Sequence, residues 1–208
     1  MYNLIGLVAG TNAPIVVNVS YSMVPELTRG DIIFMQGASP SQINAKEVSL
    51  REYLEFKNFD DVAEAICFNK KDNVEEPCKI SAQKYLAGLI SSPDFTTTKI
   101  KFVDGQEVEI NKEGDIIVYF LQEQGILVIH RAVTKINALD GTYFLTKGDS
   151  INNSLIDQTS LSSKPLKSDR ISGKTVLKIP VLGYVKLLLV DDIALLIFGC
   201  PYNTCYFP

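Results

Sequence analysis

Short β-branched runs, each bounded by Gly, Pro, Asn or Asp, recur along both flanks of this 208-residue chain and constrain its fold more than any other feature. Runs of this length and composition predict strands, and the turn residues between them predict short connections. Asp140-Gly141 carries the signal of a tight hairpin. The sequence therefore predicts a mainly β protein built on an antiparallel β-sheet. The candidate strands are residues 15–19, 31–35, 115–121, 126–135, 141–147, 174–179 and 184–189.

The middle of the chain has a different pattern. Apolar residues at helical spacing predict helices over residues 45–56, 60–67 and 81–90, and Ser49 with Glu52 matches a capping box. Two further strand-like stretches flank Asp104-Gly105 and predict a hairpin. We therefore expect a discontinuous β-rich core with an inserted α/β subdomain and an apolar C-terminal segment. The core takes residues 1–36 and 113–190, the insertion residues 37–112, and the C-terminal segment residues 191–208.

Composition limits the classes of partner and site. Hydrophobic residues make up 46% of the chain, enough for a real core, and the net charge of -4 offers no basic face for nucleic acid. The four cysteines form two close pairs, Cys67 with Cys78 and Cys200 with Cys205. Neither pair has zinc-ligand spacing and there is a single histidine, so we expect no metal and no cofactor. Two disulfides in an oxidising compartment and four buried thiols both fit the cysteine count.

Both ends of the chain are apolar without forming an obvious membrane span. Residues 4–9 are too short to cross a bilayer and lack a basic start, and residues 181–198 are interrupted by Asp191-Asp192. We expect contact with a membrane surface at one or both ends.

The only histidine, His130, lies within a β-branched run and is the first candidate for chemistry. An imidazole can serve as the base that takes the proton of a serine nucleophile. A histidine on the solvent face of the strand is the alternative. Serines are frequent here, so only their sequence context can select a nucleophile.

Five blocks in a fixed order supply that context. Together they resemble the type I signal peptidases of the archaeal and endoplasmic-reticulum branch, in which histidine replaces the lysine base of the bacterial enzymes. The resemblance covers roughly residues 12–36 and 113–190. The blocks are Ser-Tyr-Ser-Met-Val-Pro-Glu-Leu-Thr-Arg-Gly-Asp (20–31), Gly-Asp-Ile-Ile-Val-Tyr (114–119), Ile-His-Arg-Ala-Val (129–133), Thr-Lys-Gly-Asp with Asn-Asn and Asp (146–157), and Gly-Lys with Ile-Pro-Val-Leu-Gly-Tyr-Val (173–185).

The resemblance assigns roles to individual residues. It implies Ser22 as the nucleophile, His130 as the general base, and Asp157 or Asp149 as the carboxylate that orients the imidazole. Ser20, together with the backbone N–H of Ser22, corresponds to the oxyanion-binding groups of the bacterial branch, although a serine that caps a turn is an equal alternative for Ser20. Three further positions, Met23, Pro25 and Tyr119, are candidate substrate contacts.

The chain departs from the family pattern at three places, one of which is Val24, where glutamate or methionine is commoner. Ser150-Ile151 is inserted before Asn152-Asn153, which lengthens the segment between the two aspartates and leaves the choice between them open. Tyr21 stands between the serines where glycine is usual, which narrows the freedom of the backbone there.

The resemblance also implies a substrate and a location. Such enzymes remove signal peptides from exported preproteins, bind the peptide extended along a strand, and act on the extracytoplasmic side of a membrane. Most carry an N-terminal transmembrane anchor, and we expect that this chain lacks it because it begins close to the serine block. Two alternatives remain: a non-catalytic peptide-binding or scaffold subunit of a secretion complex, and a self-cleaving repressor-type protease. The second needs a lysine base and is disfavoured by His130.

Overall fold

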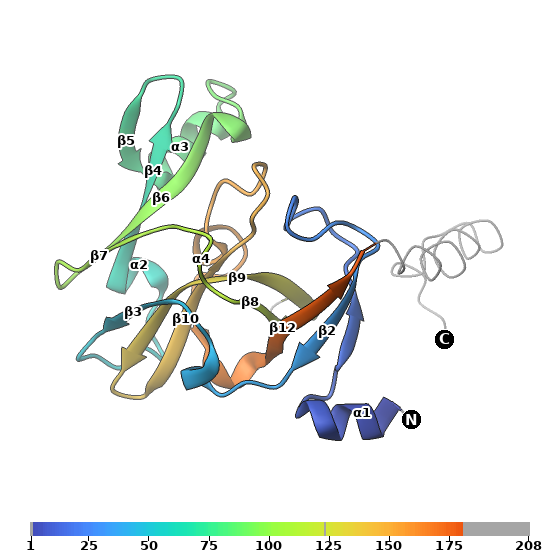
Figure 1. Ribbon diagram of the computed structural model, residues 1–208. Coiled ribbons are helices and arrows are strands. Elements are labelled where there is room, and N and C mark those ends of the chain that lie inside the picture. Colours follow the sequence, from blue (N-terminus) through green and yellow to red (C-terminus); the bar gives the residue numbers. More distant parts are fainter. Residues whose placement is uncertain (1, 123, 181–208) are drawn as a thin grey trace, which may run out of the picture.

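The fold is known from a computed structural model that describes residues 2–122 and 124–180. Its core is an eight-stranded sheet in which neighbouring strands are antiparallel apart from one parallel pair (Figure 1). The prediction of a mainly antiparallel β fold is therefore confirmed. The strand order is β1 (Ile15–Val17), β2 (Ile32–Gln36), β12 (Ile171–Ile179), β8 (Ile116–Leu121), β9 (Ile126–Ala138), β10 (Gly141–Lys147) and β11 (Leu166–Lys167), with β3 (Lys46–Ser49) parallel to β9.

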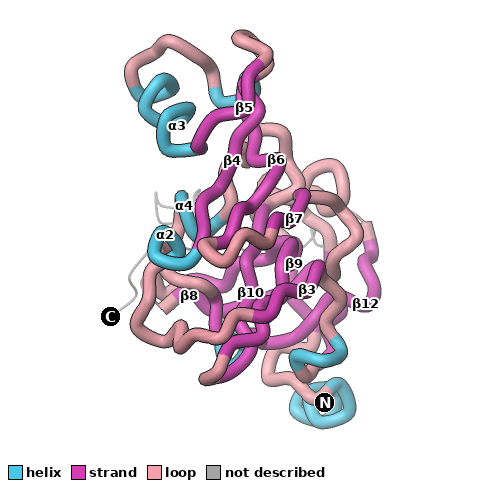
Figure 2. Tube along the Cα trace, turned by 90° about the vertical axis from the view of Figure 1, so that its left-hand side faces the viewer, coloured by secondary structure: helices cyan, strands magenta, loops and turns pink. Residues whose placement is uncertain are grey.

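A second sheet of four strands stands on the larger one (Figure 2). Its order is β5 (Val74–Pro77), β4 (Ala63–Asn69), β6 (Phe95–Phe102) and β7 (Glu107–Glu109), and α3 (Cys78–Leu86) packs against β4. One buried cluster joins the two sheets, with Ile100 from β6 and Ile136 from β9 among its fully buried members. Burial of such side chains away from water stabilises the contact between the sheets.

The other helices are short. They are α1 (Tyr2–Ala9), α2 (Phe59–Val62), α4 (Asp157–Ser160) and the 3-10 turns η1 (Pro40–Gln42), η2 (Ser92–Asp94) and η3 (Ser168–Arg170). Among the residues that the structure describes, no helix has the length and apolar character needed to cross a membrane.

Most of the strands expected from the sequence form at or near their expected positions. Six of the seven appear as β1, β2, β8, β9, β10 and β12, and the seventh, residues 184–189, lies outside the described residues. The hairpin at Asp140-Gly141 is confirmed by the pairing of Gly141 with Ala138. The hairpin at Asp104-Gly105 is confirmed by the pairing of β6 with β7, and Gly105 takes the left-handed φ of 88° that its turn requires.

Two of the three predicted helices are wrong. Residues 45–56 contain β3, which pairs with β9 so that Val48 lies opposite Ile136. Residues 60–67 contain most of β4, which pairs with β5 and β6. In both places strand pairing with distant residues overrides a short apolar pattern that a helix would also satisfy. The third helix forms as α3, and Gly88 ends it with a left-handed φ of 72°.

Residues 37–112 supply all of the second sheet. They also supply β3, which belongs to the larger sheet. The division into a β-rich core and an inserted subdomain therefore remains a proposal, and the connection between the two parts includes main-chain pairing. The apolar segment at residues 191–208 lies outside the described residues.

A disulfide joins Cys67 on β4 to Cys78 at the start of α3. This pairing agrees with the disulfide interpretation of the first cysteine pair. Cys200 and Cys205 lie outside the described residues.

Asp140 ties the chain after β3 to the hairpin of β9 and β10. Its Oδ2 accepts the backbone N–H groups of Leu54 and Glu55, each at 2.9 Å, and the Tyr143 hydroxyl at 3.1 Å. Desolvation acts to raise the pKa of Asp140, but these hydrogen bonds outweigh it, so that the pKa lies below its ordinary value.

We predict that replacing both Cys67 and Cys78 by alanine lowers the free energy of unfolding by about 3 kcal/mol, because the bridge restricts the unfolded chain. Urea unfolding of the oxidised protein measures the difference. Added reductant should narrow the gap between the wild type and the double variant. Equal unfolding free energies under oxidising conditions would contradict the prediction.

We predict that Asp140→Asn lowers the free energy of unfolding by about 1–2 kcal/mol at neutral pH. The folded carboxyl has the lower pKa, so its stabilisation is complete above the unfolded value of about 3.9 and is lost as the pH falls through the folded value. Asparagine does not titrate, so the difference between the two proteins should shrink below about pH 4. Urea unfolding at several pH values tests this, and a difference independent of pH would refute it.

Candidate active site

The two serines of the loop after β1 are in direct contact. Ser20 Oγ accepts the backbone N–H of Ser22 at 2.9 Å and donates to Ser22 Oγ at 2.9 Å. Because the hydroxyl proton of Ser20 points to Ser22, the Ser22 hydroxyl keeps its own proton for another acceptor. The two groups assigned to an oxyanion hole, Ser20 Oγ and the Ser22 N–H, are bonded to each other in this state.

Asn18 holds this loop and was not identified from the sequence. Its Nδ2 donates to Ser20 O at 3.1 Å and to Thr28 O at 2.9 Å, and its Oδ1 accepts the Ser20 N–H at 3.2 Å. Asp31 closes the far end by accepting the N–H and hydroxyl of Thr28. An asparagine at the end of a strand and just before a serine-rich loop is typical of a turn in which the side chain hydrogen-bonds to nearby backbone groups. This pattern could have identified Asn18 from the sequence.

Met23 anchors the loop instead of contacting a substrate. Its side chain is fully buried in a cluster with Leu27, Val118 and other apolar residues, and Ile129 packs against this cluster. The expectation that Met23 touches substrate is therefore wrong for this conformation. Pro25 is exposed and remains a candidate contact.

His130 and Asp157 form a buried pair. Nδ1 of His130 lies 2.7 Å from Oδ2 of Asp157, and both side chains are almost fully buried. A carboxylate only accepts hydrogen bonds, so Nδ1 carries a proton, and in the neutral imidazole Nε2 is then the nitrogen with the free lone pair. The interpretation of His130 as a solvent-facing strand residue is therefore wrong.

The Asp157 carboxylate has two further partners. Tyr119 donates its hydroxyl to Oδ2 at 2.8 Å, and Thr146 donates to the same oxygen at 2.6 Å. Tyr119 is buried, so the expectation that it contacts substrate is also wrong. Desolvation, with the charge of Asp157 as a lesser cause, raises the pKa of Tyr119 far above its ordinary value. The Tyr119 hydroxyl therefore stays protonated and acts as a donor.

Asp149 has a different partner. The neighbouring guanidinium of Arg131 binds it through Nε at 2.9 Å and Nη2 at 2.6 Å, and Arg131 Nη1 also donates to the Gly114 carbonyl at 2.5 Å. This two-point ion pair fixes the end of β10 beside β9. Of the two candidate carboxylates, the structure pairs Asp157 with His130 and Asp149 with Arg131.

The segment after β10 packs directly on the loop that carries Ser22. Ser150 donates its backbone N–H to the carbonyl of Ser22 at 2.9 Å. Buried Lys147 ties the two ends of this segment by donating to the carbonyls of Gly148 at 3.1 Å and Asn153 at 2.5 Å. Burial lowers the pKa of Lys147. The first of the two inserted residues thus makes the contact to Ser22.

The loop that carries Ser22 is joined to the neighbouring elements by two contacts. One is the hydrogen bond from Ser150 to the Ser22 carbonyl, and the other is the packing of Met23 in the cluster that Ile129 joins. In the part of the chain that the structure describes, the Ser22 hydroxyl is bonded to its serine neighbour and makes no hydrogen bond to the imidazole.

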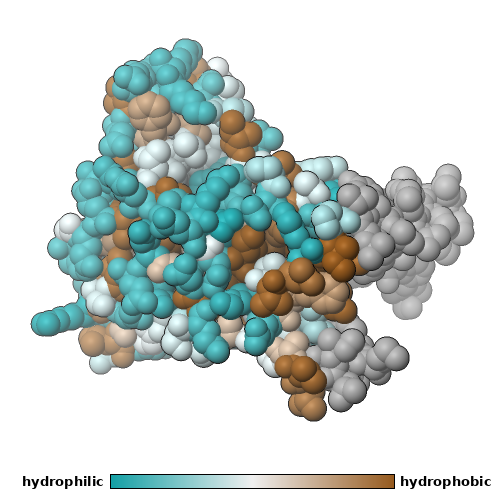
Figure 3. Space-filling model, viewed as in Figure 1, coloured by the Kyte–Doolittle hydropathy of each residue, from teal (hydrophilic) through white to brown (hydrophobic). Residues whose placement is uncertain are grey.

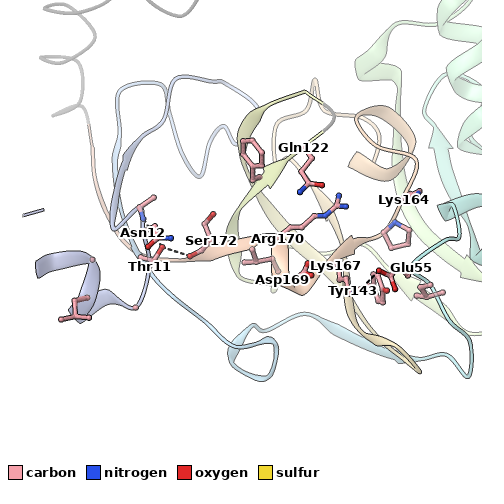
Figure 4. A pocket seen from close by; sticks show the side chains of 18 residues that line it. Thr11, Asn12, Glu55, Gln122, Tyr143, Lys164, Lys167, Asp169, Arg170 and Ser172 are labelled. Carbon is pink, nitrogen blue, oxygen red and sulfur yellow. Dashed lines mark hydrogen bonds and ion pairs between the residues drawn. The ribbon is translucent and has the colours of Figure 1, made fainter. Parts of the chain in front are cut away.

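A groove on the described part of the chain lies away from these residues. It has a volume of about 1130 Å³ and runs from α1 to η3 (Figure 4). None of the candidate active-site residues lines it. Within the described residues no group of three His, Cys, Asp or Glu side chains is arranged to hold a metal ion.

Comparison with curated proteins gives a consistent set of relatives. The "Signal peptidase complex catalytic subunit sec11" of Schizosaccharomyces pombe is 25% identical over 194 residues, which is 91% of this chain and 74% of that protein. The subunit of the same name from Scheffersomyces stipitis is 31% identical over 105 residues, or 49% of this chain and 61% of the relative. The subunit of the same name from Fusarium vanettenii is 38% identical over 81 residues, which is 38% of this chain and 45% of that protein.

The last two matches, unlike the first, span about half the length of the relatives. No protein family model matches the chain.

We predict that Gly148→Ala destabilises the protein by about 1–3 kcal/mol. A Cβ at this position would lie 2.0 Å from Asn153 Nδ2 and 2.6 Å from the Ser22 carbonyl oxygen, so the contact between the two loops must open. Ser150→Ala is the control, because it keeps the backbone N–H that binds Ser22. Thermal unfolding of both variants checks the prediction, and a Gly148→Ala protein as stable as the wild type would contradict it.

Proposed function

We propose that this chain belongs to the signal peptidase I family of the endoplasmic-reticulum type, to whose catalytic subunits it is similar, and that it is a serine endopeptidase that removes N-terminal signal peptides from exported preproteins. Ser22 is the nucleophile and His130 the general base. The observation that carries the proposal is the buried pair of His130 and Asp157, which leaves Nε2 of the only histidine able to accept a proton.

The reaction follows from these groups. Ser22 Oγ attacks the carbonyl carbon of the scissile peptide bond while its proton passes to His130 Nε2. The tetrahedral intermediate collapses when His130 returns that proton to the departing amine. Water then attacks the acyl-enzyme by the same route and regenerates the serine. Throughout, Asp157 Oδ2 holds the Nδ1 proton and stabilises the imidazolium.

The Ser20 hydroxyl has a defined place in this scheme. At present its proton points to Ser22 Oγ, while its oxygen accepts the Ser22 N–H. When a substrate carbonyl approaches, a rotation of the Ser20 side chain about its Cα–Cβ bond would move Oγ away from the Ser22 N–H, and both groups could then donate to the developing oxyanion. Such donors contribute roughly 3 kcal/mol each in comparable sites.

We propose a membrane-associated location with the catalytic part on the extracytoplasmic side. The disulfide between Cys67 and Cys78 suits an oxidising compartment. Apolar side chains are also exposed on α1, where Leu7 and Val8 are 79% and 83% accessible, and on β12. Figure 3 shows hydrophobic residues gathered on the side of the molecule where α1, β2 and β12 lie. The partners in this proposal are signal peptides and the other subunits of a signal peptidase complex.

We predict that Ser22→Ala and His130→Ala each lower the cleavage rate of a preprotein by at least about 1000-fold, because each removes a group that the chemistry requires. Incubation of the full chain with a preprotein in detergent, followed by mass spectrometry of the products, gives the rate and the cut position. Ser41→Ala, at an exposed serine in η1, is the matched control and should cleave like the wild type.

Thermal unfolding of each variant separates loss of chemistry from loss of fold. Unchanged cleavage by folded Ser22→Ala would rule out the proposed nucleophile. A wild-type protein that binds signal peptides without cutting them would instead favour the scaffold subunit.

A further inference from the structure

We propose that Tyr119 and Thr146 are positioning residues of this site. Their hydroxyl groups fix the Asp157 carboxylate so that Oδ2 holds His130 in the tautomer with a free Nε2. The inference rests on the proposed function, since it assigns a role within the same site. It concerns residues that touch Asp157 and do not touch the reacting atoms.

Three donors converge on one oxygen. Thr146 Oγ1, His130 Nδ1 and Tyr119 Oη lie 2.6, 2.7 and 2.8 Å from Asp157 Oδ2. Each hydroxyl has a single proton, and both protons go to the carboxylate. The distance of 3.2 Å between the two hydroxyl oxygens is therefore a packing contact that keeps the donors side by side.

The second carboxylate oxygen of Asp157, Oδ1, is buried and accepts no hydrogen bond from the described residues. Among the hydrogen bonds of the carboxylate, only those to Oδ2 therefore oppose a rotation about the Cβ–Cγ bond. Without the two hydroxyls the single bond to His130 would have to orient both the carboxylate and the imidazole.

The backbone of Asp157 is held by separate contacts. Thr146 donates its backbone N–H to the side-chain Oε1 of Gln158 at 3.0 Å, which ties α4 to β10. This bond does not involve the Thr146 hydroxyl. Removing either hydroxyl should thus leave α4 in place and change only the orientation of the carboxylate.

The chain offers two matched controls. Tyr143 is a second fully buried tyrosine whose hydroxyl donates to an aspartate, Asp140, away from this site. Thr134 is a second fully buried threonine, and its hydroxyl has no partner among the described residues. Tyr143→Phe and Thr134→Val therefore remove the same atoms from equally buried positions.

The test uses the fact that His130 is the only histidine. In ¹⁵N-histidine-labelled protein, imidazole NMR spectra report the tautomer of this residue without interference. We expect the wild type to show a protonated Nδ1 and an unprotonated Nε2. Tyr119→Phe and Thr146→Val should each show mixed protonation of the two nitrogens, whereas Thr146→Ser, which keeps the hydroxyl, should restore the wild-type pattern.

Cleavage kinetics give the second measurement. We expect kcat to fall roughly 10-fold in Tyr119→Phe and in Thr146→Val, as for the loss of a hydrogen bond to a charged group, with KM nearly unchanged. The two control variants should keep the wild-type kcat. A merely structural role would lower thermal stability and leave the tautomer as it is.

The inference is overturned if the imidazole spectra of Tyr119→Phe and Thr146→Val match those of the two controls. Failure of the proposed function looks different, because the wild type would then not cleave preproteins while the spectra could still differ as expected. The spectra thus decide on the positioning role, and the cleavage assay decides on the function.

Discussion

The burial of the Asp157 carboxylate is the constraint around which this part of the molecule is organised. An ionised carboxylate removed from water is costly unless donors compensate for the lost hydration. Here the compensation comes from three donors on different strands, Tyr119 on β8, His130 on β9 and Thr146 on β10. The register of these strands therefore has to be correct before the carboxylate can be buried, which couples the assembly of the sheet to that of the site.

Adjacent residues of β9 separate the two aspartates. Successive side chains of a strand point to opposite faces, so His130 and Arg131 reach different sides of the sheet. His130 binds Asp157 while Arg131 binds Asp149. Both aspartates belong to the segment that follows β10. This segment therefore runs from Arg131, which binds Asp149, to His130, which binds Asp157. The extra Ser150-Ile151 lies in that passage, where the Ser150 N–H reaches the Ser22 carbonyl.

Most of the strands were accessible from the sequence, because alternating β-branched runs are local signals, and the ordered blocks selected His130, which the structure pairs with Asp157. The second sheet was harder to predict. The apolar spacing of residues 60–67 fits a helix, but pairing with β5 and with the more distant β6 makes most of this segment a strand. From the sequence, Tyr119 is expected to contact the substrate. Its hydrogen bond to Asp157 joins residues far apart in the sequence, so no local pattern could reveal it. Thr146 belonged to a recognised block, but no local pattern reveals that its hydroxyl would reach a carboxylate eleven positions away.

The second sheet also contacts the segment that leads to Asp157. Thr97 of β6 donates both its N–H, at 2.7 Å, and its hydroxyl, at 3.1 Å, to the carbonyl of Ser154. The sulfur atoms of Cys67 and Cys78 lie against that hydroxyl. Ser154 precedes Asp157 by three residues. Through Thr97, the sheet that contains the Cys67–Cys78 disulfide therefore binds the chain just before Asp157.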